Sequence, residues 1–218
     1  MMVRCDGVMN EGLMSTRLGL SGNPSIAEST MVHRDLKLAG ITGAKLHVPH
    51  VSTAASVEHI REMKNTNNNI SAEVTPHHLF FNDESLYNYD TSLKVAPPIR
   101  GDMSRKALIE GILDGAIDCI ATDHAPHTLH DKETTFDLAS FGMIGLESCF
   151  GIVKKILVDE EGLSLIDFVE LLTVSPRKIM GLDYDLLSKG KEAEIVLFDS
   201  NKIWTFEKNN VFSRSINS

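Results

Sequence analysis

A short apolar segment that ends abruptly in acidic and basic residues carries the clearest chemical signal in the sequence. Residues 117–122 read Ile-Asp-Cys-Ile-Ala-Thr and predict a strand that is buried on both faces. Asp123, His124 and His127 follow this strand directly. Unpaired polar groups are costly to bury, and the carboxyl ends of parallel strands are where α/β enzymes place reactive groups. Asp123 could simply cap the next segment, but three such side chains within five positions favour a functional site.

Two further predicted strands also end in histidine. The segment 44–50 ends in His50, and the segment 70–75 is followed by Pro76 and the pair His77–His78. Imidazole and carboxylate are the usual ligands of a hydrolytic zinc ion, which lowers the pKa of its bound water to about 7. A carboxylate beside that water could accept and return its proton. His50 and Asp123 are the strongest candidates because each follows a buried strand.

Helical and strand-like segments alternate along the chain and would position these groups. Helices are predicted over 25–39, from Thr53, from Asp102, over 142–158 and over 165–172, and strands over 44–50, 70–75 and 117–122. Such alternation predicts a parallel sheet. Only three barrel-type strands can be counted, whereas a complete eight-stranded barrel needs about 250 residues. We therefore predict an α/β fold in which residues 1–190 form the C-terminal half of a (β/α)8 TIM-type barrel.

The two ends of the chain have a different pattern. Residues 194–199 and 202–206 predict two strands that pair as a hairpin, so that 191–218 would begin a small β subdomain at the C-terminus. Residues 1–24 are rich in glycine and methionine without a clear period, and they predict a loop. In the helix that follows, Glu28 is predicted to face solvent.

The composition restricts the classes of partner. The chain has 218 residues, with 42% hydrophobic and 23% charged residues, which is typical of a globular protein. A formal net charge of −9 and the lack of a basic run argue against a nucleic-acid partner. No apolar run approaches the ~20 residues that a membrane span needs, and no apolar signal region is found. Three widely spaced cysteines fit a reducing compartment, so we expect a cytoplasmic protein.

Five segments occur in a characteristic order and spacing. They are HVPHVST (47–53), EVTPHHL (73–79), KVAPPIR (94–100), DGAIDCIATDHAPH (114–127) and FGMIGLES (141–148). Together they resemble the dihydroorotases of the metal-dependent amidohydrolase superfamily. The resemblance extends over nearly the whole chain. TPHHL combined with TDHAPH is its specific part, since the related allantoinases and hydantoinases tend to differ in both segments.

This resemblance implies roles for individual residues. His50 matches a zinc ligand, and Asp123 matches the catalytic aspartate that contacts the metal and transfers the proton. His127 matches a substrate-contacting histidine. The turn formed by Phe141 and Gly142 matches a family segment whose backbone contacts the substrate ring. The pair His77–His78 matches no ligand, and we interpret it as structural. The implied reaction is the reversible zinc-dependent cyclisation of N-carbamoyl-L-aspartate to dihydroorotate in pyrimidine biosynthesis.

The sequence departs from the family pattern at the metal site. The His-x-His-x-Arg motif of the first family strand and the bridging carboxylate or modified lysine of the fourth are not found. Arg4 stands where another ligand histidine is expected, and a permanently protonated arginine cannot bind a cation. Ala96 replaces a substrate-contacting residue that is often asparagine. With only His50 and Asp123, the zinc site is incomplete, and we expect a truncated chain that is inactive alone. It would form a homo-oligomer or associate with a complementary chain.

Two other functions remain open at this point. The chain could be a non-catalytic, dihydroorotase-like structural partner of a carbamoyltransferase, and a His-x-His motif encoded upstream of Met1 would argue against this. It could also be an allantoinase- or hydantoinase-type enzyme, which would keep the chemistry and change the cyclic amide. Activity on dihydroorotate would separate this last alternative from the first interpretation.

Overall fold

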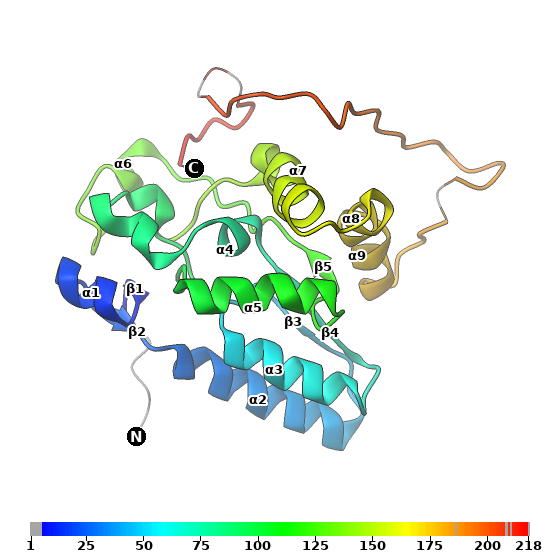
Figure 1. Cartoon of the computed structure of the whole chain (residues 1–218), viewed down its shortest axis with the longest axis horizontal. Helices are drawn as coiled ribbons and strands as arrows, with labels where there is room; N and C mark the ends of the chain where they lie inside the picture. The colour runs from blue at the N-terminus through cyan, green and yellow to red at the C-terminus, as the bar shows by residue number, and fades with distance from the viewer. Residues whose placement is uncertain (1–5, 186, 208, 210, 218) are drawn as a thin grey trace.

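Strands and helices alternate along the chain in the computed structural model, which describes residues 6–185, 187–207, 209 and 211–217 (Figure 1). The strands are β1 Met9–Asn10, β2 Gly22–Asn23, β3 Leu46–Val48, β4 Ile70–Val74 and β5 Cys119–Ile120. The α-helices are α1 Leu13–Leu18, α2 Ser25–Thr42, α3 Ala54–Lys64, α4 Pro76–Phe80, α5 Asp102–Leu113, α6 Leu129–Lys132, α7 Leu146–Lys154, α8 Leu165–Leu172 and α9 Val174–Ile179. Short 3-10 helices η1 Asp83–Asn88 and η2 Thr91–Leu93 follow α4, and the π-helical segment η3 Lys155–Glu160 extends α7. Arg4 lies outside the described residues.

The central sheet has three parallel strands in the order β3–β4–β5. Helices α2, α3 and α5 lie side by side along it (Figure 1). The three strands predicted from the sequence and their parallel arrangement are confirmed, although each strand is shorter than predicted. Within the described residues, no helix combines the length and apolar character that a membrane crossing requires.

Alternation along β4 separates the two faces of this sheet. Ile70, Ala72 and Val74 are buried in the main hydrophobic core, whereas Ser71 and Glu73 between them are partly exposed. Successive side chains of a strand point to opposite faces. The face toward the helices is therefore apolar, and the opposite face of the sheet carries polar groups.

The loop predicted for residues 1–24 is wrong for the described part of that segment, which contains β1, α1 and β2. The two strands pair in parallel over two residues each. Met9 and Met14 are buried in a second hydrophobic cluster that also includes Leu86 and Phe136. Strands of two residues leave no detectable period in the sequence, so only their packing against distant residues defines them.

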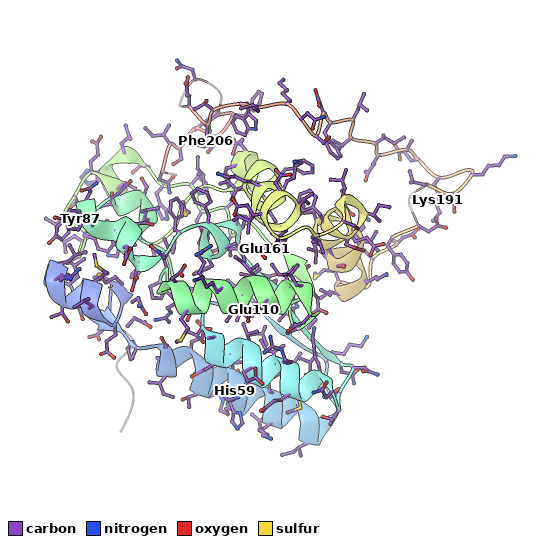
Figure 2. The ribbon with its side chains drawn as sticks, viewed as in Figure 1. His59, Tyr87, Glu110, Glu161, Lys191 and Phe206 are labelled. Atoms are coloured by element: carbon purple, nitrogen blue, oxygen red, sulfur yellow. The ribbon has the colours of Figure 1, made fainter. Side chains whose placement is uncertain are left out.

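The hairpin predicted over 194–199 and 202–206 is also wrong, because the described residues of the tail form no strand. The tail instead runs as an extended segment past α7, α8 and α9 (Figure 1). Lys191 projects outward from it (Figure 2). Leu197 and Ile203 are 98% and 94% exposed. An isolated two-stranded hairpin is marginally stable in water, and these apolar side chains lack a packing partner within the described residues.

A buried ion pair joins α2 to the chain just beyond β3. Glu28, in the first turn of α2, accepts hydrogen bonds from the backbone N–H groups of Ser52 (3.0 Å) and Thr53 (3.1 Å). Its carboxylate lies 3.8 Å from the guanidinium of Arg100, whose side chain is 3% exposed. Arg100 in turn donates to the backbone carbonyl of Asn23 at 2.7 Å. The prediction that Glu28 faces solvent is wrong, because its partners lie far away in the sequence.

Replacing Glu28 by alanine should leave the buried charge of Arg100 without its partner. Removing one member of a buried pair is strongly destabilising, and we expect the free energy of unfolding to fall by about 3 kcal/mol in urea denaturation. Asp35 lies on the same helix and pairs with Arg34 at the surface. Asp35→Ala is therefore the control, with an expected loss below about 0.5 kcal/mol. Equal losses for the two substitutions would contradict the role assigned to Glu28.

Candidate active site

The two predicted metal ligands lie at one edge of the central sheet. His50 follows β3, Asp123 follows β5, and β4 lies between these strands. The strands are parallel, so their carboxyl ends meet at the same edge. Both residues have a left-handed backbone, with φ of 35° at His50 and 46° at Asp123. Positive φ is uncommon for residues other than glycine and occurs preferentially at functional sites.

Hydrogen bonds to β4 fix the chain close to both residues. The backbone N–H of Val51, directly after His50, donates to the carbonyl of Glu73 at 3.0 Å. The backbone N–H of Ala121, two residues before Asp123, donates to the carbonyl of Val74 at 3.1 Å. His50 is partly buried and Asp123 is exposed. The sheet thus holds both predicted ligands at one edge and leaves the carboxylate open to solvent.

The three predicted substrate-binding residues form one cluster. The Nε2 atom of His127 lies 2.8 Å from the carbonyl oxygen of Phe141. A carbonyl can only accept, so this nitrogen carries the proton and Nδ1 of the neutral ring is an acceptor. A Cβ atom added to Gly142 would lie 2.9 Å from His127 Nε2 and 2.6 Å from the Cβ of Ala125. The close approach of the imidazole therefore requires glycine at position 142.

Both backbone polar groups of Gly142 are already hydrogen-bonded within the chain. Its N–H donates to the carbonyl of Lys94 at 2.8 Å, and its carbonyl accepts from the side-chain amide of Asn217 at 3.0 Å. A carbonyl oxygen has two lone pairs. Gly142 itself can therefore offer a ligand the second lone pair of its carbonyl, while its N–H is occupied.

Ser215 and Asn217, close to the C-terminus, brace this cluster, and the sequence analysis missed both. The hydroxyl of Ser215 donates to the carbonyl of His127 at 2.8 Å. The side-chain amide of Asn217 bridges the carbonyls of Ala125 and Gly142, each at 3.0 Å. Both residues are buried. No local pattern could have revealed them, because the contacts to Ala125 and His127 span 92 and 88 residues of sequence.

Two buried lysines hold the loop that carries Phe141. Lys94 is 2% exposed, and its ammonium group donates to the carbonyl of Asp137 at 2.9 Å and lies 4.5 Å from the centre of the Phe141 ring. Lys132 donates to the carbonyl of Ser140 at 2.7 Å. Burial lowers the pKa of Lys132 to about 8. Carbonyl oxygens and an aromatic face thus replace water around these cations and order the loop.

Of the three remaining histidines in the TPHHL and TDHAPH segments, His78 and His124 are hydrogen-bonded inside the protein. His78 lies 2.8 Å from the hydroxyl of Thr75 and 3.0 Å from the carbonyl of Pro97, and burial lowers its pKa to about 4. The Nδ1 atom of His124 accepts a backbone N–H at the start of α7 at 3.1 Å. Burial also lowers the pKa of His77 well below its usual value, and its Nε2 atom has no hydrogen-bond partner within the described residues.

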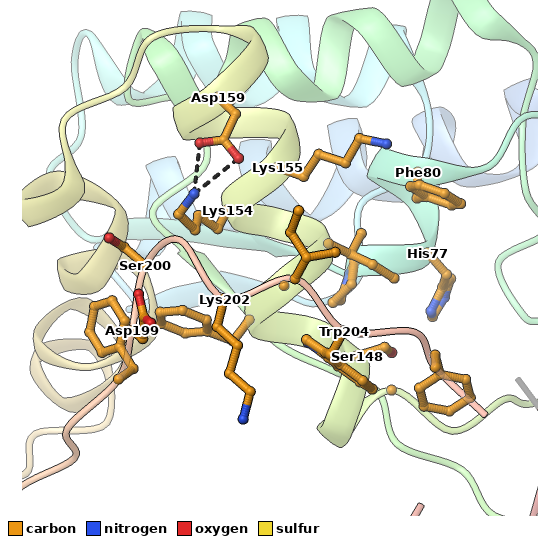
Figure 3. A pocket seen from close by; sticks show the side chains of 18 of the residues that line it. His77, Phe80, Ser148, Lys154, Lys155, Asp159, Asp199, Ser200, Lys202 and Trp204 are labelled. Atoms are coloured by element: carbon orange, nitrogen blue, oxygen red, sulfur yellow. Dashed lines mark hydrogen bonds and ion pairs between the residues drawn. The ribbon is translucent and has the colours of Figure 1, made fainter. Parts of the chain in front are cut away.

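A cleft of about 1850 Å³ lies between α4, α7 and the tail. Figure 3 shows His77 and Phe80 near one end of this cleft and Trp204 of the tail across from them. The predicted site residues do not line it. The cleft depends on the extended tail for one of its walls. Its opposite side includes Pro76 and His77, which follow β4 at the carboxyl edge of the sheet.

Comparison with known proteins decides the family. A model of the amidohydrolase family matches residues 15–216. The chain belongs to the amidohydrolase family. Among solved structures, this amidohydrolase is similar to the L-hydantoinase (dihydropyrimidinase) from Arthrobacter aurescens, with a TM-score of 0.73 and 29% identity over 79% of this chain and 40% of that chain. The dihydropyrimidinase from Brevibacillus agri shares the fold, with a TM-score of 0.72 and 23% identity over 78% of this chain and 39% of that chain.

The chain is also similar to several curated dihydroorotases. It is 45% identical to the dihydroorotase of Caldanaerobacter subterraneus subsp. tengcongensis over 98% of this chain and 49% of the relative. It is 47% identical to the dihydroorotase of Pelotomaculum thermopropionicum over 88% of this chain and 45% of the relative. The chain spans about half the length of the curated relatives it matches.

Gly142→Ala should disrupt the cluster around His127. The added methyl group would collide with Ala125 and His127, and φ of 130° at this position is suited to glycine. We expect the free energy of unfolding to fall by about 3 kcal/mol, combining backbone strain with overpacking. Gly43 has a positive φ of 71° with open space around it, so Gly43→Ala measures the backbone cost alone, about 1 kcal/mol. If both substitutions cost the same in urea denaturation, the close packing at Gly142 is refuted.

Acid should destabilise the fold through His78. The pKa of this ring is about 4 in the folded protein and about 6.5 in the unfolded chain, so the unfolded state gains the proton first as the pH falls. This contribution to stability is complete above pH 6.5 and is lost progressively toward pH 4. Between pH 7 and 4.5, the wild type should lose about 2 kcal/mol more than His78→Gln. His130→Gln, at an exposed histidine, is the control, and parallel pH profiles for wild type and His78→Gln would contradict this assignment.

Proposed function

We propose that this chain is the C-terminal half of a dihydroorotase, an amidohydrolase that opens and closes the cyclic amide of dihydroorotate. The observation that carries the proposal is the 45% identity to a curated dihydroorotase over 98% of this chain. The positions of His50 and Asp123 at one sheet edge support it. The packing of His127 against Phe141 and Gly142 supports it further, because these three residues were assigned to substrate binding by their family motifs alone.

Asp123 is the proposed proton carrier. It is exposed at the carboxyl edge of the sheet, where a small molecule and water can reach it. In the hydrolytic direction, water adds to the ring amide carbonyl of dihydroorotate. The proton that Asp123 takes from this water returns to the leaving ring nitrogen, which gives N-carbamoyl-L-aspartate. His127 and the turn from Phe141 to Gly142 would bind the substrate beside it.

His50 and Asp123 also have the donor types of a catalytic zinc site. When bound, zinc would lower the pKa of water from 15.7 to about 7. Three protein ligands are usual in such sites, and the described residues bring these two to the sheet edge. The donor types therefore fit zinc and the number of donors does not. We propose that the remaining ligands come from another segment or chain.

We further propose that residues 1–190 form half of a (β/α)8 barrel and that residues 191–218 begin a smaller subdomain. The polar face of the sheet and exposed tail residues such as Leu197 support association with a complementary segment or a second copy. The free, buried thiols of Cys119 and Cys149 support a cytoplasmic location.

A hydantoinase- or allantoinase-type activity is the second candidate. The similarity to the L-hydantoinase structure favours it, and such an enzyme would use the same residues on a different cyclic amide. The identity of 29% to that hydantoinase compares with 45% to the dihydroorotase. Dihydroorotate is therefore the preferred substrate in this proposal.

A chimeric enzyme tests the assignment directly. In it, this chain replaces the corresponding half of the curated dihydroorotase that is 45% identical. We expect the chimera to hydrolyse dihydroorotate faster than hydantoin or allantoin. Asp123→Asn should lower kcat at least about 100-fold, because positioned proton transfer contributes factors of this size. His130→Asn, at an exposed histidine on α6, is the matched control and should leave kcat unchanged.

The possible outcomes separate the candidates. A folded, zinc-loaded chimera without activity on dihydroorotate would refute the proposal, and faster turnover of hydantoin would favour the second candidate. The isolated 218-residue chain is expected to be inactive. Turnover by the isolated chain that Asp123→Asn abolishes would show that self-association completes the site.

A further inference from the structure

A second group of metal-ligating side chains lies on the sheet, separate from His50 and Asp123. Within the described residues, His47, Glu73 and Cys119 each offer one ligand atom, and these atoms all lie within 4.8 Å of one another. The three residues come from three different strands, β3, β4 and β5. We propose that they bind a zinc ion that links the three strands.

The strand register explains why these side chains meet. Glu73 lies directly opposite Cys119, and His47 lies opposite Ser71, two residues before Glu73. Alternation along the strands puts all of them on the face away from the helices. The side chains of His47 and Glu73 are 29% and 21% exposed, whereas Cys119 is 2% exposed. An ion can therefore enter past the imidazole and the carboxylate and reach the thiol.

The surroundings of His47 are those of a metal-binding histidine. Its Nδ1 atom lies 2.8 Å from the hydroxyl of Ser71, and its Nε2 atom lies 3.0 Å from the carboxylate of Glu73. Histidine ligands typically donate their second ring N–H to a neighbouring oxygen, which fixes the ring and its tautomer. Ser71 supplies this oxygen. In the neutral ring, Nδ1 then donates its hydrogen to Ser71, and the lone pair of Nε2 is free to bind an ion held between His47 and Glu73.

The donor set selects the metal. Thiolate, imidazole and carboxylate together favour zinc over magnesium or calcium, which prefer oxygen ligands. Ligand atoms around a tetrahedral zinc ion lie about 3.3–3.6 Å apart. His47 Nε2 and the Glu73 carboxylate are already 3.0 Å apart, and all three ligand atoms lie within 4.8 Å of one another, so a closure of at most about 1 Å completes the geometry. Burial raises the pKa of the Cys119 thiol to about 12, so the metal-free thiol is protonated. Forming the Zn–S bond releases that proton to solvent.

This site shares no ligand with the proposed catalytic site. His47 precedes His50 by three residues, and Cys119 precedes Asp123 by four residues. The two sets of ligands can therefore be removed independently. Of the two proposed sets of ligands, the set on the sheet face is the one that includes a cysteine, which gives that site a spectroscopic signature of its own.

Cobalt titration of the metal-free 218-residue chain tests the proposal. A Co²⁺–thiolate bond gives a near-ultraviolet charge-transfer band that imidazole and carboxylate ligands do not give. We expect this band to saturate at one Co²⁺ per chain and to disappear when Zn²⁺ is added. Cys119→Ala should abolish it, whereas Cys149→Ala, at a buried cysteine of α7, and Cys5→Ala should retain it. A missing band, or a band that survives Cys119→Ala, would overturn the proposal.

Substitutions at His47 and Glu73, which are partly exposed, give a second measurement in case Cys119→Ala fails to fold. His47→Gln and Glu73→Gln should each weaken Co²⁺ binding at least about 10-fold, and Ser71→Ala about 10-fold through the orientation of His47. Asp123→Asn should retain both the band and the affinity, which separates this proposal from the dihydroorotase assignment. Unchanged affinity in the His47 and Glu73 variants would overturn it.

Discussion

The buried pair of Glu28 and Arg100 is the interaction on which the position of the candidate site depends. Two charges removed from water are tolerated only when hydrogen bonds satisfy them. Here the backbone N–H groups of Ser52 and Thr53 satisfy the carboxylate, and the carbonyl of Asn23 satisfies the guanidinium. These contacts begin two residues after the first predicted metal ligand. Helix α2, the small β1–β2 unit and the turn beyond β3 are therefore fixed relative to one another by one electrostatic centre.

The sheet gives each of its boundaries a different chemical character. Its helical face is closed by aliphatic side chains, and its carboxyl edge presents His50 and Asp123 on left-handed backbone. The remaining face carries the imidazole, carboxylate and thiol of the proposed zinc site. Three short strands thus support two sets of donors. Alternation along the strands places one set on a face of the sheet, and the residues that follow the strands place the other set at its carboxyl edge. A substitution on one boundary need not disturb the others.

The sequence was informative where burial imposes a pattern. The segment 70–75 was predicted as a strand, and β4 there alternates between buried apolar and partly exposed polar residues because one of its faces packs against helices. The strands predicted in the tail had suitable β-forming residues, but apolar side chains such as Leu197 and Ile203 remain almost fully exposed, and propensity without packing does not make a strand. Glu28 looked like any solvated helical glutamate, since the partner that buries it lies 72 residues away. The cluster around His127 was assembled from family motifs, and its braces at Ser215 and Asn217 required the three-dimensional contacts.

The hydrogen bonds from the last residues of the chain to the His127 cluster also set the order in which that cluster can form. Asn217 holds together two segments that are 92 and 75 residues away from it. During synthesis on a ribosome, the sheet and helices α2, α3 and α5 can assemble while the tail is still inside the exit tunnel. The loops that carry His127 and Gly142 cannot be locked until residue 217 has emerged. The proposed substrate-binding surface therefore matures after the sheet that carries His50 and Asp123.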